Sequence, residues 1–310
     1  MVRLLLAAIA LATVLPVTGA GHDVAQAVSN GAVFLLFLLY GIKLSRGEVL
    51  AGLGNVRLLV PLLLWVFGAM ALGGWLGWRA SLPALPPMLA LGFLFLGVLP
   101  STVQSATVYS SLAGGNVAGS VIAAALLNIA GVFISAPLFA VLAGGEGGGL
   151  YAGTLAKVMT MMLLPFVIGQ AVQGLCAPWV KGHKPLVTFL ERGTIGLAVY
   201  VSVSSAVEQG IWRLLDARAW GVVVLVCALL LVLGYGGSWL LGGALRLSRE
   251  DRVSMVFAGA QKSVAMGAPL ATVMFPPASA GMILLPLLVY HLAQMVVAAP
   301  VAVRLREGAA

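Results

Sequence analysis

A lysine within a long apolar segment is the residue of this sequence that points most clearly to chemistry. Lys262 lies in the segment AGAQKSVAMGAP (258–269), inside an apolar run that extends from Val253 to Phe275. An ammonium at the centre of a membrane helix costs at least about 2.5 kcal/mol. Its side chain cannot easily reach the interface from there, and the apolar segments hold almost no Asp or Glu to pair with it. The position therefore predicts a functional site.

A second group of polar residues lies in the segment LPSTVQSATV (99–108), next to Pro100. Glycine and proline permit a helix to break. Unwound backbone at membrane depth is tolerated only where protein or a water-filled cavity satisfies its amide groups. Both segments therefore predict broken helices that bind a substrate or an ion. Their candidate binding residues are Thr102, Gln104, Ser105, Gln261, Lys262 and Ser263.

Three more polar residues, Asn128, His291 and Gln294, lie within apolar segments. His291 and Gln294 are three residues apart and share a helix face. They are included among the candidate substrate- or ion-binding residues. The alternative is that they form hydrogen bonds between helices and only hold the bundle together.

The sequence argues against an enzyme, a metal centre or an ATP-driven pump. Nothing resembles a Ser-His-Asp arrangement, and carboxylates are too scarce for acid–base hydrolysis. Cys176 and Cys227 are far apart and lack the spacing of metal ligands. The chain has no Walker A loop and no glycine-rich dinucleotide motif at the start of a helix. We therefore expect no catalytic residue, no cofactor and no metal.

The composition is that of an integral membrane protein. The chain has 310 residues, of which 61% are hydrophobic and 8% charged, and its mean hydropathy is +1.10; soluble domains carry roughly 25% charged residues. A spanning helix needs about 20 apolar residues. This predicts an all-α polytopic protein with ten transmembrane helices, the fourth and ninth broken. The predicted spans are 2–20, 25–44, 57–78, 84–112, 115–143, 151–174, 189–207, 217–244, 252–275 and 278–303.

The first span has a second interpretation. The stretch MVRLLLAAIALATVLPVTGA combines a basic start, an apolar core and small residues near Ala20, which is also typical of a secretory signal peptide. Its cleavage would leave nine spans and a mature start near Gly21. An even number of spans and the repeat described below favour retention.

The distribution of basic residues predicts the orientation. Of the 17 Lys and Arg residues, 12 fall on one side of the ten-span arrangement, three on the other side, and two, Lys157 and Lys262, within spans. By the positive-inside rule, both termini are cytoplasmic and the protein lies in the inner (plasma) membrane. The net charge of +8 thus reflects topology, and we expect the lipid bilayer rather than nucleic acid as partner.

Two segments suggest an internal repeat. In LLNIAGVFISAPL (126–138) and LVYHLAQMVVAAPV (288–301), a polar residue, Asn128 or His291, precedes a proline by nine residues. The two copies would cover about 1–143 and 151–310, five spans each. Because five is odd, the second copy enters the membrane from the opposite side. Inverted repeats are common in secondary transporters, whose binding sites lie near the midplane at broken helices.

The chain resembles the bile acid:sodium symporter superfamily, and within it the sodium bile acid symporter-like branch. The resemblance rests on segments 92–121, LLPFVIGQ (163–170), 258–269 and LLPLLVYHLAQ (284–294). It implies a single transporter domain, 1–310, with two inverted repeats. Helices 4 and 9 would cross at their breaks within a core of helices 3–5 and 8–10, beside a panel of helices 1, 2, 6 and 7. Transport would proceed by alternating access.

The same resemblance argues against sodium coupling. Sodium-coupled members hold Na⁺ with side chains on helices 4, 5 and 9, and this chain keeps Ser105 and Gln261 at such positions. It has Ala106 and Lys262 in place of asparagines and Phe257 in place of a glutamate. An ammonium near a metal site repels Na⁺ strongly in a low dielectric. We therefore expect Lys262 to replace a coupling cation or to exchange protons.

These observations predict a secondary active transporter of a small organic anion, since the cavity would carry a lysine and few acids. Three alternatives remain. A sodium-coupled symporter of bile-acid-like anions would keep the chemistry of the superfamily. A non-transporting membrane regulator of calcium homeostasis would match other members of the branch. A channel is also conceivable, although a channel filter usually needs rings of like groups from several subunits.

Overall fold

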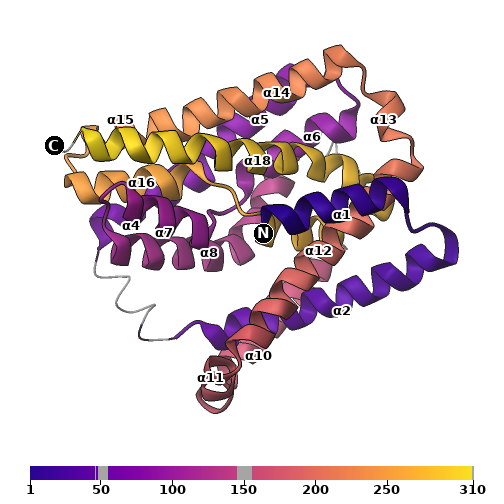
Figure 1. The fold of residues 1–310 in the computed structure, drawn as a ribbon, viewed down its shortest axis with the longest axis horizontal. Coiled ribbons are helices and arrows are strands. Elements are labelled where there is room, and N and C mark those ends of the chain that lie inside the picture. The colour runs from indigo at the N-terminus through magenta and orange to yellow at the C-terminus, as the bar shows by residue number, and fades with distance from the viewer. Residues whose placement is uncertain (46, 48–54, 145–155, 309–310) are drawn as a thin grey trace. The chain divides into compact units, whose positions relative to one another are not determined.

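The computed structural model describes residues 1–45, 47, 55–144 and 156–308, and all regular elements in these ranges are helices (Figure 1). Within these described ranges, six helices are long and apolar enough to cross a membrane, or up to eight if each of two bent pairs forms one span. The all-α, multi-pass class is thus confirmed, whereas the number of ten spans remains a prediction. The chain divides into two compact units.

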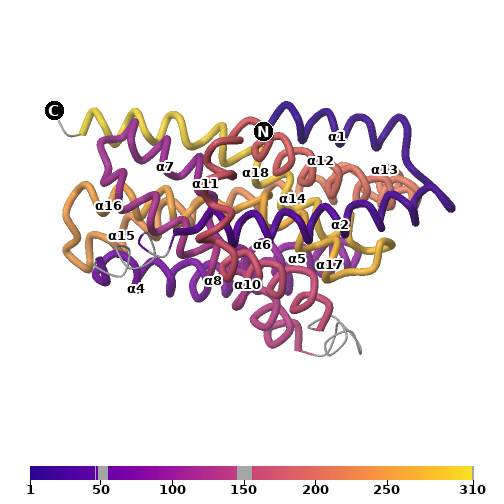
Figure 2. The backbone as a smooth tube through the Cα atoms, turned by 90° about the horizontal axis from the view of Figure 1, so that it is seen from below, coloured from indigo at the N-terminus to yellow at the C-terminus, as the bar shows by residue number. Residues whose placement is uncertain are grey.

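The first unit comprises residues 1–45, 144–216 and 267–284. Within it, α1 packs along α12, and α2 packs against α10 (Figure 2). Its helices are α1 (Val2–Val14), α2 (Gly19–Lys43), η2 (Met159–Leu163, a π-helix), α10 (Leu164–Ala171), α11 (Gln173–Gly182), α12 (Lys184–Glu208) and α13 (Ile211–Leu214).

Two predicted boundaries in this unit are wrong. The first helix ends at Val14, because Pro16 cannot continue it, and α2 already begins at Gly19, so that the expected loop at 21–24 is helical. The interval 175–188, also expected between spans, lies almost entirely in α11 and the start of α12. The early start of α2 and the helical interval 175–188 arise because the predictions followed the apolar core of each span, whereas helices extend into polar interfacial residues.

Glycines allow α2 and α10 to approach until their backbones touch. A Cβ added to Gly41 would lie 2.2 Å from the carbonyl oxygen of Phe166, and one added to Gly169 would lie 2.3 Å from that of Leu38. Both distances are shorter than any real carbon contact, and both obstacles are backbone atoms that cannot turn aside. The residues at 41 and 169 must therefore be glycine for this packing.

Gly41→Ala should consequently destabilise the protein by about 1–3 kcal/mol, as overpacking does. Gly31→Ala in the same helix is the matched control, since no atom lies within 4 Å of its added Cβ. Alanine is the better helix former, so this variant should be neutral or stabilising by up to about 1 kcal/mol. Thermal unfolding of both variants in detergent would test the contrast. An equal loss of stability in Gly41→Ala and Gly31→Ala would contradict the close contact between α2 and α10.

The second unit comprises residues 46–143, 217–266 and 285–310. Helices α17 and α18 extend through both units. The helices of the second unit and the two shared helices are α4 (Val56–Leu64), η1 (Trp65–Ala69, a π-helix), α5 (Met70–Ser81), α6 (Pro87–Val98), α7 (Val103–Leu112), α8 (Val117–Ala143), α14 (Ala217–Val232), η3 (Leu233–Gly237, a π-helix), α15 (Ser238–Ala244), α16 (Arg249–Ala260), α17 (Val264–Met274) and α18 (Pro277–Glu307).

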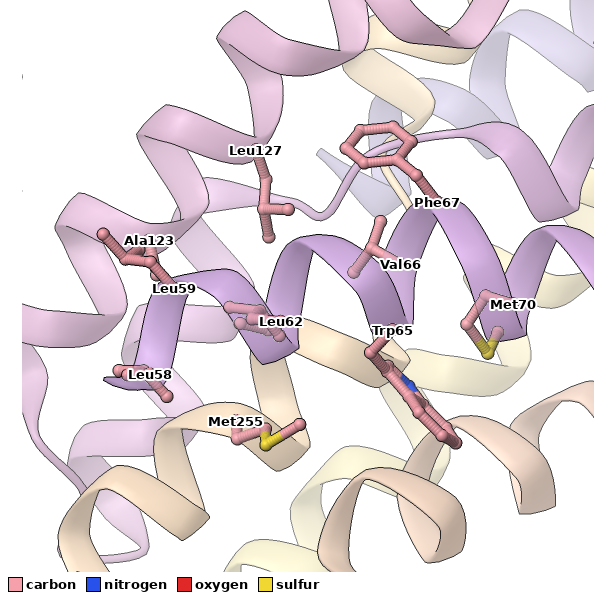
Figure 3. Packing of buried hydrophobic residues seen from close by; sticks show 11 residues of the cluster. Leu58, Leu59, Leu62, Trp65, Val66, Phe67, Met70, Ala123, Leu127 and Met255 are labelled. Atoms are coloured by element: carbon pink, nitrogen blue, oxygen red, sulfur yellow. The ribbon is translucent and has the colours of Figure 1, made fainter. Parts of the chain in front are cut away.

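A hydrophobic cluster in this unit fixes the helices around the candidate site. Leu58, Leu62 and Trp65 on α4 and η1 pack against Leu127 of α8 and Met255 of α16 (Figure 3). Polar caps fix two of the helix starts. The side chain of Asn55 accepts a hydrogen bond from the amide of Leu58 at the start of α4, and the Ser248 side chain caps α16 in the same way. The unit thus holds α4, α8 and α16 in a fixed register.

Candidate substrate and ion site

Two helix breaks meet in the second unit. The chain is extended at Leu99 and Thr102, between α6 and α7, and again at Gln261, between α16 and α17. Helices α6 and α7 are bent by 60° at the first break. The amide of Ser263 donates a hydrogen bond to the carbonyl of Pro100 over 3.0 Å, which joins the two breaks directly. The prediction that both apolar segments are broken is therefore confirmed.

The Lys262 ammonium is enclosed by backbone carbonyls. Its Nζ lies 2.7 Å from the oxygen of Leu99, 2.8 Å from that of Gly97 and 3.5 Å from that of Val66, and the residue is fully buried. Gly97 lies in the last turn of α6 and Leu99 just follows it, where the helix dipole places negative partial charge. An ammonium has three donors, so these three oxygens account for all of them.

No carboxylate forms an ion pair with Lys262 in the part of the chain that the structure describes. The buried charge is held by peptide dipoles instead. Carbonyl oxygens that replace a hydration shell are also the ligands with which ion channels bind alkali cations. The surroundings of this ammonium thus resemble those of a bound monovalent metal ion.

Gln294 of α18 binds the backbone of Lys262 on both sides. Its Oε1 accepts the amide of Lys262 at 2.8 Å, and its Nε2 donates to the carbonyl of the same residue at 3.1 Å. Both groups would lack a helical partner at the break. Gln294 Nε2 also lies 2.7 Å from Nδ1 of His291. This pair therefore holds the backbone that carries the lysine.

Other side chains satisfy the remaining carbonyls at the breaks. Asn128 Nδ2 donates to the oxygens of Ser101 and Ala124, each at 2.8 Å. Ser135 Oγ donates to the oxygen of Val98 at 2.8 Å, and the Tyr290 hydroxyl to that of Ala260 at 2.5 Å. Sequence reasoning missed Ser135 and Tyr290, because a single hydroxyl in an apolar helix does not reveal whether it faces a broken neighbour.

Three buried polar atoms next to the breaks have no hydrogen-bond partner within the described residues, namely Nε2 of Gln261, Oγ of Ser101 and Nε2 of His291. Gln294 Nε2 can only donate to His291 Nδ1, since its Oε1 already accepts the Lys262 amide. In neutral His291 the proton must then reside on Nε2. Unpaired buried donors cost about 1–3 kcal/mol each, so a bound solute that accepts hydrogen bonds from these three atoms would be stabilised.

The remaining candidate binding residues have other partners or surroundings. The hydroxyls of Thr102 and Ser105 are hydrogen-bonded to each other, and Ser105 also donates to Oε1 of Gln261. Ser263 Oγ accepts the amide of Met266 at 3.2 Å and so caps α17. Gln104 is exposed. The expectation that Gln104 reaches Gln261 is not met, since Ser105 is the residue of this segment whose side chain hydrogen-bonds Gln261.

A metal centre built from side chains is not found in the described part of the chain, where no three His, Cys, Asp or Glu residues gather. Among the described residues, Lys262 alone brings a positive charge to the breaks. The arrangement can therefore hold a solute through hydrogen bonds and charge, and it offers no general base or nucleophile for covalent chemistry.

Comparison with known proteins agrees with this chemistry. Residues 1–307 match the SBF-like CPA transporter family. An uncharacterized protein of Pseudomonas aeruginosa is 36% identical over 301 residues, which cover 97% of this chain and 90% of the relative. Escherichia coli YfeH, whose name describes it as a symporter, is 34% identical over 98% of this chain and 91% of its own length. Mouse sodium/bile acid cotransporter 7 is 21% identical over 86% of this chain and 80% of its own length.

The family match covers residues 1–307. The relatives described above whose names state a function are named as transporters. The family explains the scarcity of catalytic groups, since a transporter needs none. The predicted resemblance and the predicted absence of enzymatic function are both confirmed by these comparisons. The chain belongs to the SBF-like CPA transporter family, within the bile acid:sodium symporter superfamily.

Proposed function

We propose that the protein is a secondary active transporter that moves a small organic anion by alternating access, with Lys262 in place of a coupling sodium ion. The observation that carries this proposal is the Lys262 ammonium, buried among the carbonyls of Val66, Gly97 and Leu99. The amine is bound covalently to the protein and cannot leave as a sodium ion does. It supplies the electrostatic effect of the cation in those steps of the transport cycle in which it is protonated.

The anionic nature of the substrate is supported by electrostatics. All three donors of Lys262 are used by backbone oxygens, so the lysine does not hydrogen-bond the substrate. Its positive charge nevertheless lacks a carboxylate partner in the described part of the chain, and unpaired buried charges are unfavourable. The free donors of Ser101, Gln261 and His291 lie at the same breaks. An anion with several acceptor oxygens would satisfy both the charge and these donors.

The proposed architecture is ten spans in two inverted repeats, with broken helices 4 and 9 that cross. Contacts between the two breaks support it, as does the occurrence of a π-helix, η1 or η3, in the segment before each break. The two compact units support a division into panel and core. We also propose cytoplasmic termini in the plasma membrane. A cysteine at Ser248 should then react only with reagents added from the cytoplasmic side.

A sodium-coupled symporter of bile-acid-like anions is the second candidate, because the mouse relative is named a sodium/bile acid cotransporter. The position of Lys262 speaks against it, since Na⁺ and an ammonium cannot occupy the same carbonyl cage. Proton coupling fits better, because a lysine in this position can release and take up a proton. Counterflow in proteoliposomes, with and without Na⁺ and with a pH gradient, distinguishes these modes. Absence of counterflow for every anion tested would instead favour a regulator that does not transport.

Gln261 should be a binding residue by this account, and Gln104 serves for comparison. Gln261 is buried with an unpaired amide nitrogen, whereas Gln104 is exposed. Gln261→Ala should weaken binding of the transported anion by about tenfold or more, equivalent to about 1.4 kcal/mol, with little change in folded yield. Gln104→Ala should have a smaller effect. Normal affinity with a greatly reduced yield of Gln261→Ala would show that the residue is only structural.

A further inference from the structure

Helix α11 is bent sharply away from α10, the helix that precedes it. It runs at 94° to the helical segment formed by residues 156–171. Side chains of the bend hold it to the end of α2, because Gln170 Nε2 donates to the carbonyl of Leu44 at 3.0 Å and Gln173 Nε2 donates to the same oxygen. Residues 156–171 belong to the sixth of the proposed spans, and a helix perpendicular to such a span would run along the membrane rather than through it.

One face of α11 packs on protein, and the opposite face is apolar too. Val180 is buried against Leu39 and Ile42 of α2 and Val187 of α12. On the other face, Leu175 is 85% exposed, and Trp179 is 52% exposed. Phe189 in the adjacent part of α12 is 72% exposed. Large apolar side chains at the end of a membrane span, with tryptophan among them, are typical of the boundary between headgroups and acyl chains.

Basic residues surround the same end of the unit. Lys181, at the end of α11, and Lys184 and Arg192, on α12, are all exposed. Lys43 lies nearby, at the end of α2, and is paired with Glu191 at 2.6 Å. By the orientation proposed above, this end is cytoplasmic. The cytoplasmic leaflet carries negative surface charge.

We infer that α11 is an interfacial helix that binds anionic phospholipid headgroups of the cytoplasmic leaflet. Leu175 and Trp179 insert at the level of the upper acyl chains, and Lys181 and Lys184 contact the phosphates. Such a contact fixes the depth of the first unit in the bilayer. It depends on the chemistry of this surface and is independent of the transported substrate.

Lipid-specific quenching tests the inference on the full-length protein. Leu175→Cys, in a background with Cys176→Ser and Cys227→Ser, is labelled with bimane and placed in equimolar phosphatidylcholine and phosphatidylglycerol vesicles. Either the first or the second lipid is brominated. Brominated phosphatidylglycerol should quench the bimane fluorescence more than brominated phosphatidylcholine does. The ratio of the two quenching efficiencies should rise by about fivefold for each lysine at low salt. Because the contact is ionic and exposed, 0.5 M NaCl should reduce the preference.

Variants assign the preference to the two lysines. Lys181→Gln with Lys184→Gln should bring the ratio of the two quenching efficiencies to about one. Lys157→Gln is the matched control, because this exposed lysine lies at the far end of the preceding helical segment, and it should leave the ratio unchanged. The inference is wrong if the two lipids quench equally in the protein with both lysines, if the preference survives the double substitution, or if only aqueous iodide quenches the label.

Discussion

Lys262→Ala is expected to abolish uptake of the anion or to make it newly dependent on an external cation. The substitution removes two strong bonds to the oxygens of Leu99 and Gly97 and a longer one to Val66. The proposed cycle depends on this charge, so we expect uptake to be slower by at least about tenfold, equivalent to about 1.4 kcal/mol. Initial rates in proteoliposomes, over a range of pH and of Na⁺ concentration, measure the effect.

Two comparisons make this result specific. Lys157→Ala removes an exposed lysine and should leave the rate within about twofold, since exposed charges contribute little. Lys262→Met keeps most of the side-chain volume without the charge, and it should fail in the same way as Lys262→Ala. Uptake by Lys262→Ala that equals that of the unsubstituted protein at every pH and Na⁺ concentration would exclude a role for the lysine in transport.

Gln294→Leu should be the most destabilising substitution near the site. It leaves both the amide and the carbonyl of Lys262 without a partner in the membrane interior. Each unsatisfied buried group costs about 1–3 kcal/mol, so we expect a loss of about 2–6 kcal/mol in the free energy of unfolding. Titration with sodium dodecyl sulfate in mixed micelles measures this quantity.

Gln26→Leu is the matched control for Gln294→Leu. Within the described residues its side-chain amide bonds Asn30 alone, one turn along the same helix, at 3.1 Å, and such pairs contribute about 0.2–0.5 kcal/mol. If the two substitutions changed the unfolding free energy equally, the hydrogen bonds of Gln294 to the Lys262 backbone would not be what stabilises the break. A large loss confined to Gln294→Leu would identify it as the main support of the backbone around Lys262.

Much of the fold could be predicted because apolar length and helix-breaking residues act locally. Apolar segments predicted the all-helical membrane class. Pro100 located the first break, and the Gly259–Pro269 segment located the second. The motifs around them identified the transporter superfamily. The inverted arrangement and the number of spans remain predictions, since neither follows from the described helices alone.

The partners of the polar side chains could not be predicted, because backbone carbonyls carry no sequence signal. Any residue could have supplied the oxygens that Gly97, Leu99 and Val66 present to Lys262. For the same reason, sequence alone left open whether Asn128 and Gln294 bind substrate or support the helices. Their bonds to the broken backbone favour support. The π-helix η1, which contains Val66, likewise has no pattern that distinguishes it from an α-helix.

Sodium binding to purified protein tests the replacement of the coupling ion most directly, because it needs no knowledge of the substrate. A ligand that binds only the folded state raises the unfolding temperature in a concentration-dependent way. Unfolding temperatures are compared in NaCl and in choline chloride at equal ionic strength. The unsubstituted protein should show no difference, whereas Lys262→Ala should gain a saturable stabilisation by Na⁺ as the ion enters the carbonyl cage. Stabilisation of the unsubstituted protein by Na⁺, or no response of Lys262→Ala at any Na⁺ concentration, would contradict the proposal that Lys262 takes the place of the ion.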